Sequence, residues 1–221
     1  MSLVNYVQQD EIALLSIDDG KANAMSSDMI AAVNGALDQA EKDAKVVIIS
    51  GREGVFCGGF DLKTIRGGDA AASQAMTLAG SRLTMRLYGF PKPIIMANTG
   101  HSVALGGFLL LTADYRIGIT GEFSIGLNEV AIGLSLPPFA LMLVNARINT
   151  RHRTNAAISA TMYSPEEAIN VGFLDEVVEP RDLMARVMEK AASLLQLDAK
   201  AFAGVKQSMR GADISGVLEI L

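Results

Sequence analysis

Cysteine, histidine and tryptophan are scarce in this 221-residue sequence, and the scarcity excludes several kinds of site. Cys57 is the only cysteine, so no internal disulfide or cluster of thiolate ligands can form, which favours a reducing compartment such as the cytoplasm. We expect Cys57 to behave as a small buried hydrophobic residue. The two histidines, His101 and His152, occur in no motif with metal-ligand spacing, so we expect no metal site.

Positive charge is also in deficit. Lys and Arg total 19 against 24 Asp and Glu, so the sequence has no basic footprint for nucleic acid or for an anionic membrane surface. The first 20 residues carry four acidic side chains and lack the pattern of a signal peptide. Residues 93–113 contain no Lys, Arg, Asp or Glu, but polar turn-forming residues at 98–102 interrupt them. This indicates a buried strand and a buried helix, and we expect no membrane span.

The residues that are present predict one α/β globule, because half of them are hydrophobic and only 19% are charged. We expect strands at 13–17, 46–50, 94–97, 115–119 and 173–178. We expect helices at about 27–40, 105–112, 165–171, 183–194 and 201–210. Residues 46–50 are apolar and β-branched without alternation, which indicates a strand covered by helices on both faces. Residues 63–79 show no clear pattern and are compatible with a mobile flap.

Two glycine-rich turns follow predicted strands. Residues 51–63 contain four glycines, and residues 100–108 contain three. Glycine permits positive φ and close approach of the backbone to a ligand, but no G-K-[ST] follows the first turn, so it is not a phosphate-binding loop. The second turn leads into a helix, whose first N–H groups attract negative charge. Taken alone, each turn is as compatible with an ordinary loop as with a ligand-binding site. On neighbouring strands, however, one amide from each could bind a single oxygen, as in an oxyanion hole.

Four blocks of the sequence resemble the crotonase superfamily, also called the enoyl-CoA hydratase/isomerase family. Lys21 to Met25 is similar to the N-A-L segment of the family, and Val55 to Lys63 to its F-x-x-G-x-D-L-K loop. Gly100 to Asp114 resembles the second glycine turn and helix, and Phe123 to Gly133 the F-x-x-P-E-x-x-x-G stretch. The blocks occur in the order of the family and cover nearly the whole chain.

The resemblance implies a crotonase/ClpP-like fold, a coiled repeat of β-β-α units with C-terminal helices. We expect residues 1–180 to form the core domain and residues 181–221 a truncated C-terminal helical region of the same domain. A shortened C-terminus would leave the acyl pocket more open, or completed by a neighbouring subunit. The resemblance also implies a homotrimer or hexamer that acts on acyl-CoA thioesters, with no cofactor beyond the coenzyme A of the substrate.

The resemblance further implies a site that stabilises a thioester enolate. It places the two oxyanion amides at Phe60 and Leu105 and the acid/base carboxylate at Glu129. A single Glu is ordinarily a solvated surface residue, but an apolar pocket can raise the pKa of a carboxyl toward working pH, which suits proton removal beside a thioester. The substrate contacts that we carry over are Ala22, Ala24, Gly58, Asp61, Leu62, Lys63, His101, Ser102, Phe108, Asn128 and Pro137.

Phe108 departs from the family pattern, because it stands where hydratases that use two glutamates carry the second one. Phenylalanine cannot position water or donate a proton, so we favour isomerisation by one shuttling base over hydration. Hydration would need another polar group, and His101 and Ser102 are near in sequence. Thioester hydrolysis is an alternative of the same class. An inactive CoA-binding or assembly subunit is the alternative of another class, although such a subunit would not need Glu129.

Overall fold

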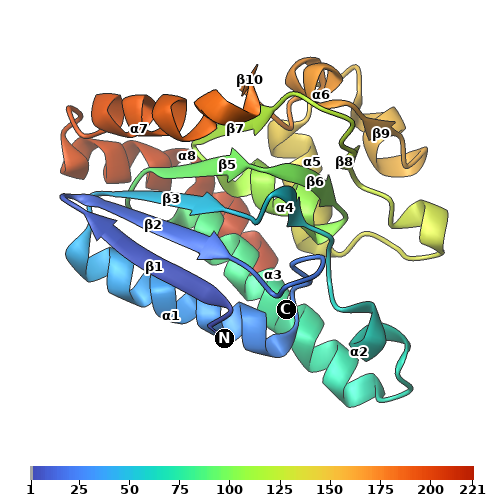
Figure 1. The fold of residues 1–221 in the computed structure, drawn as a ribbon. Helices are drawn as coiled ribbons and strands as arrows, with labels where there is room; N and C mark the ends of the chain where they lie inside the picture. Colours follow the sequence, from blue (N-terminus) through green and yellow to red (C-terminus); the bar gives the residue numbers. More distant parts are fainter. Residues whose placement is uncertain (1) are drawn as a thin grey trace.

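The computed structural model describes residues 2–221 and shows two β-sheets surrounded by helices (Figure 1). The strands are β1 (Val4–Gln9), β2 (Ile12–Ile17), β3 (Val46–Ser50), β4 (Gly54–Cys57), β5 (Ile94–Asn98), β6 (Gly100–Val103), β7 (Tyr115–Ile119), β8 (Ile125–Gly126), β9 (Met162–Tyr163) and β10 (Glu176–Val178). The α-helices are α1 (Ser27–Asp43), α2 (Leu62–Arg66), α3 (Ala70–Gly89), α4 (Leu105–Thr112), α5 (Pro138–Arg147), α6 (Pro165–Val171), α7 (Leu183–Leu194) and α8 (Ala199–Leu218). The short helices are η1 (Val130–Ile132), η2 (Thr154–Ile158) and η3 (Pro180–Asp182).

The chain repeats a β-β-α unit that alternates between the two sheets. The larger sheet has the order β1-β2-β3-β5-β7-β10, and the smaller sheet has the order β4-β6-β8-β9. Strands β3, β5 and β7 are parallel neighbours in the first, and the strands that follow them, β4, β6 and β8, are parallel neighbours in the second. Helices come after each pair of strands, so the fold is the coiled repeat that the sequence led us to expect.

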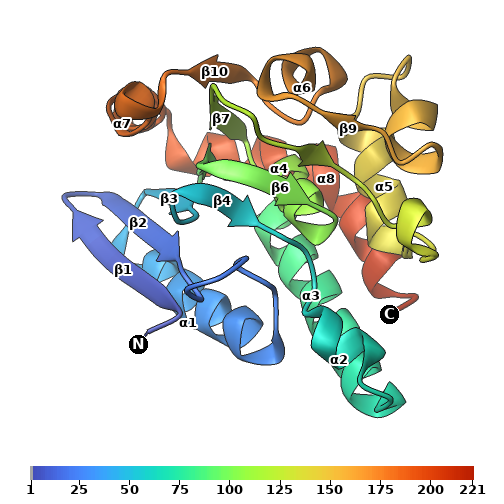
Figure 2. The same ribbon diagram turned by 45° about the vertical axis from the view of Figure 1, so that its right-hand side comes forward.

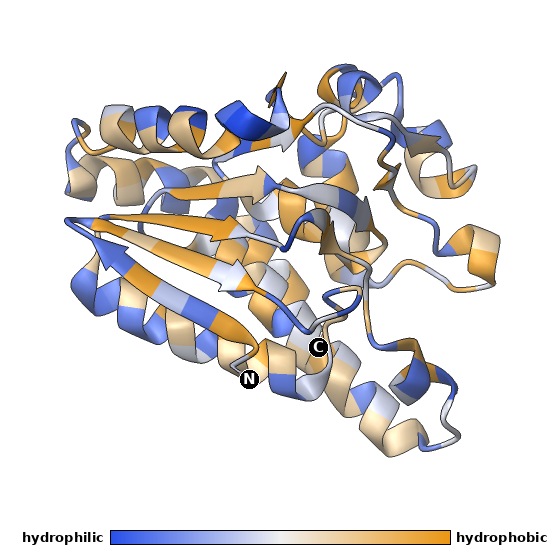
Figure 3. Ribbon diagram, viewed as in Figure 1, coloured by the Kyte–Doolittle hydropathy of each residue, from blue (hydrophilic) through white to orange (hydrophobic). Residues whose placement is uncertain are grey.

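Strand β3 shows how helices cover both faces of the larger sheet. Val47 and Ile49 belong to the core shared with α1 and α3, whereas Val46 and Ile48 belong to a second core under α7. All four side chains are buried, which confirms the interpretation of residues 46–50. Helices α1 and α7 lie on opposite sides of the sheet in Figure 1, and the strands between them are largely hydrophobic in Figure 3.

Several helix boundaries follow directly from local signals in the sequence. The Ser26 side chain caps α1 by accepting from the Met29 N–H. The Ser164 side chain accepts from the Glu167 N–H, while the Glu167 carboxylate accepts from the Ser164 N–H, so α6 begins with a capping box. Gly172 ends α6 at a φ of +106°. These predictions are confirmed.

Other expectations differ from the structure. The glycine-rich turns contain strands β4 and β6, which are too short and too rich in glycine to show a strand pattern. Residues 63–79, whose structure the sequence left open, form most of α2 and the first half of α3, and their mobility as a flap stays a prediction. The buried face of α3 includes Gly80, Ser81 and Thr84, and the hydroxyls of Ser81 and Thr84 donate to carbonyls one turn earlier. Within residues 63–79 themselves Met76 is the only buried residue, so hydrophobic periodicity is weak there.

The two ends of the chain also differ from expectation. Strand β1 was not predicted because half of it is polar, and it pairs antiparallel with β2 at the edge of the sheet. The last strand is confined to β10, shorter than 173–178, and α8 extends well beyond 201–210. Helices α7 and α8 contribute Leu183, Val187 and Val217 to the two cores. The division at residue 180 stays a prediction.

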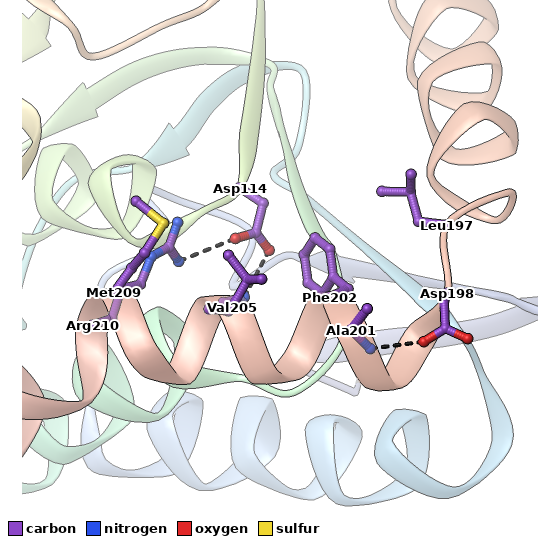
Figure 4. Close-up of a pocket in the computed structure, with 9 residues that line it drawn as sticks. Asp114, Leu197, Asp198, Ala201, Phe202, Val205, Met209 and Arg210 are labelled. Carbon is purple, nitrogen blue, oxygen red and sulfur yellow. Dashed lines mark hydrogen bonds and ion pairs between the residues drawn. The ribbon is translucent and has the colours of Figure 1, made fainter.

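Asp114, at the end of the loop after α4, anchors α8 to the sheets. Its carboxylate lies 2.7 Å from Lys206 Nζ and 3.1 Å from Arg210 Nη1, and it accepts from the Ile94 N–H. Figure 4 shows Asp114 facing the helix beside Arg210, where a cavity of about 390 Å³ lies along α8. The ion pairs of Asp114 thus connect α8 to the loop before β7. Lys206, one of the two partners, is almost completely buried.

Helix α2 and the adjoining start of α3 project from the body of the molecule, as Figure 2 shows. Helix α2 begins within the last residues of the first glycine-rich turn, so the projecting segment adjoins that turn. Among residues 2–221, every helix is too short or too polar to cross a lipid bilayer.

Candidate active site

The two glycine-rich turns lie against each other. A Cβ atom built on Gly59 would be 3.0 Å from the Ala104 Cβ and 3.7 Å from the Leu105 N, so backbone touches backbone between the turns. A Cβ on Gly106 would be 2.1 Å from the carbonyl oxygen of Cys57. Glycine is required at Gly106, where a Cβ would overlap the backbone of β4, and it is favoured at Gly59, where the φ is +105° and a Cβ would meet Ala104 closely. Cys57 itself is fully buried, as expected, and burial raises the pKa of its thiol to about 12.

The turns leave two backbone N–H groups without a partner. Phe60 follows Gly59, whose φ is +105°, and Leu105 follows Ala104, whose φ is +54°. No hydrogen bond among residues 2–221 uses the N–H of Phe60 or of Leu105. Leu105 is also the first residue of α4, where N–H groups have no partner within the helix and the helix dipole is positive. Two free amides on touching turns can donate to one oxygen, which is the chemistry that an oxyanion hole requires.

A cavity of about 340 Å³ lies beside these turns. Five of the predicted residues line it together: Phe60, Leu105, Phe108, Glu129 and Pro137. The other lining residues are Ile65, Ser73, Thr77, Leu134, Ser135, Leu136 and Phe139. The lining is mostly apolar, and Glu129 carries its one titratable side chain.

Glu129 is 9% exposed, and its Oε2 is buried without a hydrogen-bond partner in the described part of the chain. Burial raises the pKa of the carboxyl to about 7, against a smaller lowering effect of its own backbone N–H. The Glu129 carbonyl accepts from the N–H groups of Ile132 and Leu134, so η1 holds the residue at the cavity wall. A carboxyl with this pKa can both take and return a proton near neutral pH.

Phe108 closes the cavity next to Glu129. Its ring is 1% exposed and meets the Phe139 ring edge to face, with centroids 5.6 Å apart. The polar groups of the lining other than Glu129 are the hydroxyls of Ser73, Thr77 and Ser135, and Thr77 Oγ1 donates to the Ser73 carbonyl. Phe108 and Phe139 therefore make one part of the cavity lining apolar.

Three of the expected coenzyme A contacts come together outside the cavity. The Gly58 N–H donates to the Ala22 carbonyl at 2.8 Å, and a Cβ on Gly58 would be 3.2 Å from the Ala22 Cβ. The Ala24 N–H donates to an Asp19 carboxylate oxygen at 3.0 Å. These small residues form a close-packed strip beside the first amide, and their contact with a ligand stays a prediction.

The residues after Phe60 form the start of α2. Asp61 caps this helix by accepting from the N–H groups of Lys63 and Thr64, and the Thr64 hydroxyl helps to hold the pKa of the Asp61 carboxyl below its usual value. Leu62 and Lys63 are exposed on the same helix. None of these three predicted contacts lines the cavity, and the Asp61 carboxylate is occupied by the helix that it caps.

His101 and Ser102, predicted as substrate contacts, lie on β6 and do not line the cavity. His101 Nδ1 accepts from the Ser124 N–H at 2.9 Å, and its ring meets Phe123 edge to face. Ser102 is fully buried and donates to Asn98 Oδ1 at 2.8 Å. Both side chains are used in packing the smaller sheet, so neither is placed to orient water beside Glu129.

Asn128 precedes Glu129, and its Oδ1 is buried without a partner in residues 2–221. The sequence alone missed Ser73, Thr77 and Phe139 in the cavity. Ser73 and Thr77 belong to α3, whose pattern was unclear, and Phe139 looks like an ordinary core residue. Within the described residues, no three His, Cys, Asp or Glu side chains come together to hold a metal ion.

Comparisons with known proteins place the chain in a family. The family model for enoyl-CoA hydratase/isomerase matches residues 7–215. The mitochondrial enoyl-CoA delta isomerase 1 of Rattus norvegicus is 32% identical over 200 residues, which cover 87% of this chain and 67% of that protein. A probable enoyl-CoA hydratase of Bacillus subtilis is 32% identical over 216 residues, covering 89% and 82% of the two chains.

Solved structures show the same fold. An enoyl-CoA hydratase/isomerase family protein from Pseudomonas syringae superposes with a TM-score of 0.95 at 41% identity, covering 98% of this chain and 95% of that one. The human mitochondrial delta3-delta2-enoyl-CoA isomerase superposes with a TM-score of 0.94 at 27% identity, covering 98% and 86%. The expected fold and the resemblance drawn from the four sequence blocks are confirmed.

Proposed function

This chain is an enzyme of the enoyl-CoA hydratase/isomerase family, and from that premise we propose that it converts 3-enoyl-CoA thioesters into 2-enoyl-CoA thioesters. One observation carries the proposal. Glu129, buried and with a pKa raised to about 7, shares a cavity with the turns that present the Phe60 and Leu105 amides, while Phe108 fills the wall beside it.

The proposed reaction moves one proton and one double bond. The Glu129 carboxylate removes a proton from C2, and the electron pair of that C–H bond delocalises onto the thioester oxygen. The amides of Phe60 and Leu105 donate hydrogen bonds to this oxygen and stabilise the dienolate. Glu129, now a carboxylic acid, returns the proton to C4, so the double bond passes from C3–C4 to C2–C3 and no atom is gained or lost.

The expected rate contributions of the two amides and of the Glu129 carboxyl are consistent with these separate roles. Each oxyanion donor in comparable sites contributes about 2.7–4 kcal/mol to the transition state. A positioned acid/base group contributes about 10²–10⁴ in rate, most effectively when its pKa is near the working pH. The two turns would thus stabilise the enolate, and Glu129 would move the proton.

Hydration is disfavoured by the same cavity. Hydration by two carboxylates needs a second acid/base group, and Glu129 is the one titratable side chain in the described lining, where Phe108 packs on Phe139 and the other polar groups are the hydroxyls of Ser73, Thr77 and Ser135. His101 and Ser102 are engaged elsewhere. Thioester hydrolysis would use the same two amides with Glu129 as the base for water, so it stays the alternative within this class, and release of free coenzyme A distinguishes it. An inactive CoA-binding subunit would have no use for a buried unpaired carboxyl, which is costly to keep.

The substrate class follows from the lining. It contains no Lys or Arg among the described residues, so we propose an uncharged acyl chain. The coenzyme A contacts proposed are Ala22, Ala24, Gly58 and, through a phosphate, Lys63. A homotrimer or hexamer and a cytoplasmic location stay predictions, and light scattering of the purified protein tests the first.

Product identity tests the proposal. Purified protein is given 3-enoyl and 2-enoyl thioesters in parallel, and products are separated by chromatography. Isomerisation predicts that the 3-enoyl thioester yields the conjugated 2-enoyl thioester and that little 3-hydroxyacyl thioester forms from either. Accumulation of 3-hydroxyacyl thioester or of free coenzyme A would contradict it.

A further inference from the structure

The turn between β2 and α1 is closed by two side chains that bind each other's backbone. The Asp19 N–H donates to Asn23 Oδ1 at 3.0 Å, and the Asn23 N–H donates to Asp19 Oδ1 at 2.8 Å. Asp19 also accepts from the N–H groups of Lys21 and Ala24. We call this reciprocal arrangement of Asp19 and Asn23 the clasp. The Asp19 carboxylate thus binds the N–H groups of Lys21, Asn23 and Ala24 at once.

The Asn23 side chain joins the clasp to β4. It is fully buried, and its Nδ2 donates to the carbonyls of Ile17 at 3.0 Å, Phe56 at 3.1 Å and Val55 at 3.3 Å. The φ of Asn23 is +51°, a conformation that asparagine tolerates better than most residues. Asparagine therefore meets both requirements of the position, a left-handed backbone and an amide donor.

The clasped segment pairs with the backbone that carries the first amide. The Gly58 N–H donates to the Ala22 carbonyl, and the Met25 N–H donates to the Gly59 carbonyl, each at 2.8 Å. Met25 and Phe60 form an isolated parallel bridge. The Gly59 carbonyl and the Phe60 N–H belong to one planar trans peptide group and point in opposite directions. The bond from Met25 therefore sets the direction of the Phe60 N–H.

We propose that Asp19 and Asn23 are positioning residues of the oxyanion hole, which hold Met25 against Gly59 and so aim the Phe60 amide. The inference rests on the proposed function, in which that amide binds the thioester oxygen. Neither side chain lines the cavity, so both act through the backbone. The second amide has its own anchor, since the Ala104 carbonyl accepts from the Phe108 N–H at 3.2 Å within α4.

The test uses acetoacetyl-CoA as a probe, because its acidic C2 ionises to an enolate with its own ultraviolet absorption. An oxyanion hole lowers the pH at which half of the bound probe is enolate. Asn23→Gly removes the three donated bonds and still permits positive φ. Asn34→Ala is the matched control, since Asn34 also donates to a carbonyl and binds Arg86, but on α1.

We expect the wild-type protein and Asn34→Ala to give the same half-enolate pH, below that of the free probe. Asn23→Gly raises it by about one unit, a tenfold loss of enolate stabilisation. Asp19→Asn, which keeps one acceptor oxygen and replaces the one bound to Ala24, is a milder second variant with a smaller rise in the same direction. Circular dichroism and saturating probe ensure that folded, occupied protein is compared.

The outcomes separate the two proposals. A wild-type protein that binds the probe without lowering its half-enolate pH lacks an oxyanion hole, and the proposed function then fails. A wild-type protein that lowers it, together with folded clasp variants that lower it equally, overturns only the role of Asp19 and Asn23. A purely structural role would reduce the melting temperature of these variants and leave the half-enolate pH unchanged.

Discussion

Gly59 lies against Ala104, and both residues have positive φ immediately before the amides of Phe60 and Leu105. Alanine at +54° is strained, and strain of this kind costs about 1–3 kcal/mol and concentrates at functional sites. At Gly59 the two turns thus approach to contact, with the Ala104 Cβ and the Val103 carbonyl facing the glycine.

Replacement of Gly59 by alanine tests this contact. Gly59→Ala is expected to lower kcat at least tenfold, because the new Cβ would lie 3.0 Å from the Ala104 Cβ and push the turns apart. Gly54→Ala is the control, since Gly54 has a φ of +80° and nothing within 4 Å of its Cβ position. Both substitutions lower the free energy of unfolding by about 1–2 kcal/mol, because alanine is strained at a positive φ. Steady-state kinetics of the two variants compares them, and equal kcat values would contradict the account.

The pKa of Glu129 predicts the pH dependence of activity. Its carboxylate form is the base, and burial raises its pKa to about 7, so kcat/KM should fall as pH drops through 7. Below that value the expected slope is about tenfold per pH unit, which follows from one ionisation. Rates measured from pH 5 to pH 9 check this, and a flat profile between pH 6 and pH 8 would speak against Glu129 as the base.

The same pKa predicts that Glu129 destabilises the fold at high pH. The carboxyl titrates near 4.5 when unfolded and near 7 when folded, so the folded state holds the proton more tightly. Stability is unaffected below pH 4.5, falls as pH rises from 4.5 to 7, and stays reduced above 7. The substitution Glu129→Gln should therefore raise the free energy of unfolding by about 3 kcal/mol more at pH 8 than at pH 4.5. Urea unfolding at both pH values measures it, and an equal gain at both would contradict it.

Asp114 predicts a stability effect separate from the active site. Asp114→Ala leaves Lys206 and Arg210 with buried, unpaired charges, so it should lower the free energy of unfolding by about 3–5 kcal/mol. Asp38→Ala removes an exposed ion pair with Arg86 and should cost about 0–1 kcal/mol. Chemical denaturation of both variants gives the comparison, and similar losses would show that the Asp114 cluster does not anchor α8.

Some elements could be predicted because short-range signals decide them. Helix α4 and strand β7 have the expected bounds, since apolar runs there are separated by a polar turn. Ser164 and Gly172 mark the ends of α6 through capping chemistry that involves only near neighbours. The two glycine-rich turns were also singled out from the sequence, and the structure brings Phe60 and Leu105 to one cavity; their role as oxyanion donors stays a prediction.

Other features depend on contacts between distant residues. Asn23 bonds to Val55 and Phe56, more than thirty residues away, so no local pattern shows its role. Strand β4 exists through its pairing with β6, and Gly80 of α3 is buried against the Phe60 ring, where a Cβ would lie 2.3 Å from a ring carbon. His101 was placed beside the site by sequence proximity, but strand direction turns its side chain to Ser124.

The central claim is that one carboxyl moves the proton between two carbons of an acyl-CoA, and Glu129→Gln tests it most directly. Turnover of a 3-enoyl thioester is followed for the wild-type protein and the variant, with coenzyme A binding measured by calorimetry. The account predicts a loss of at least about 10²-fold in kcat with binding nearly unchanged, because the amide keeps the shape and cannot accept the proton. An unchanged rate in a folded variant would contradict it.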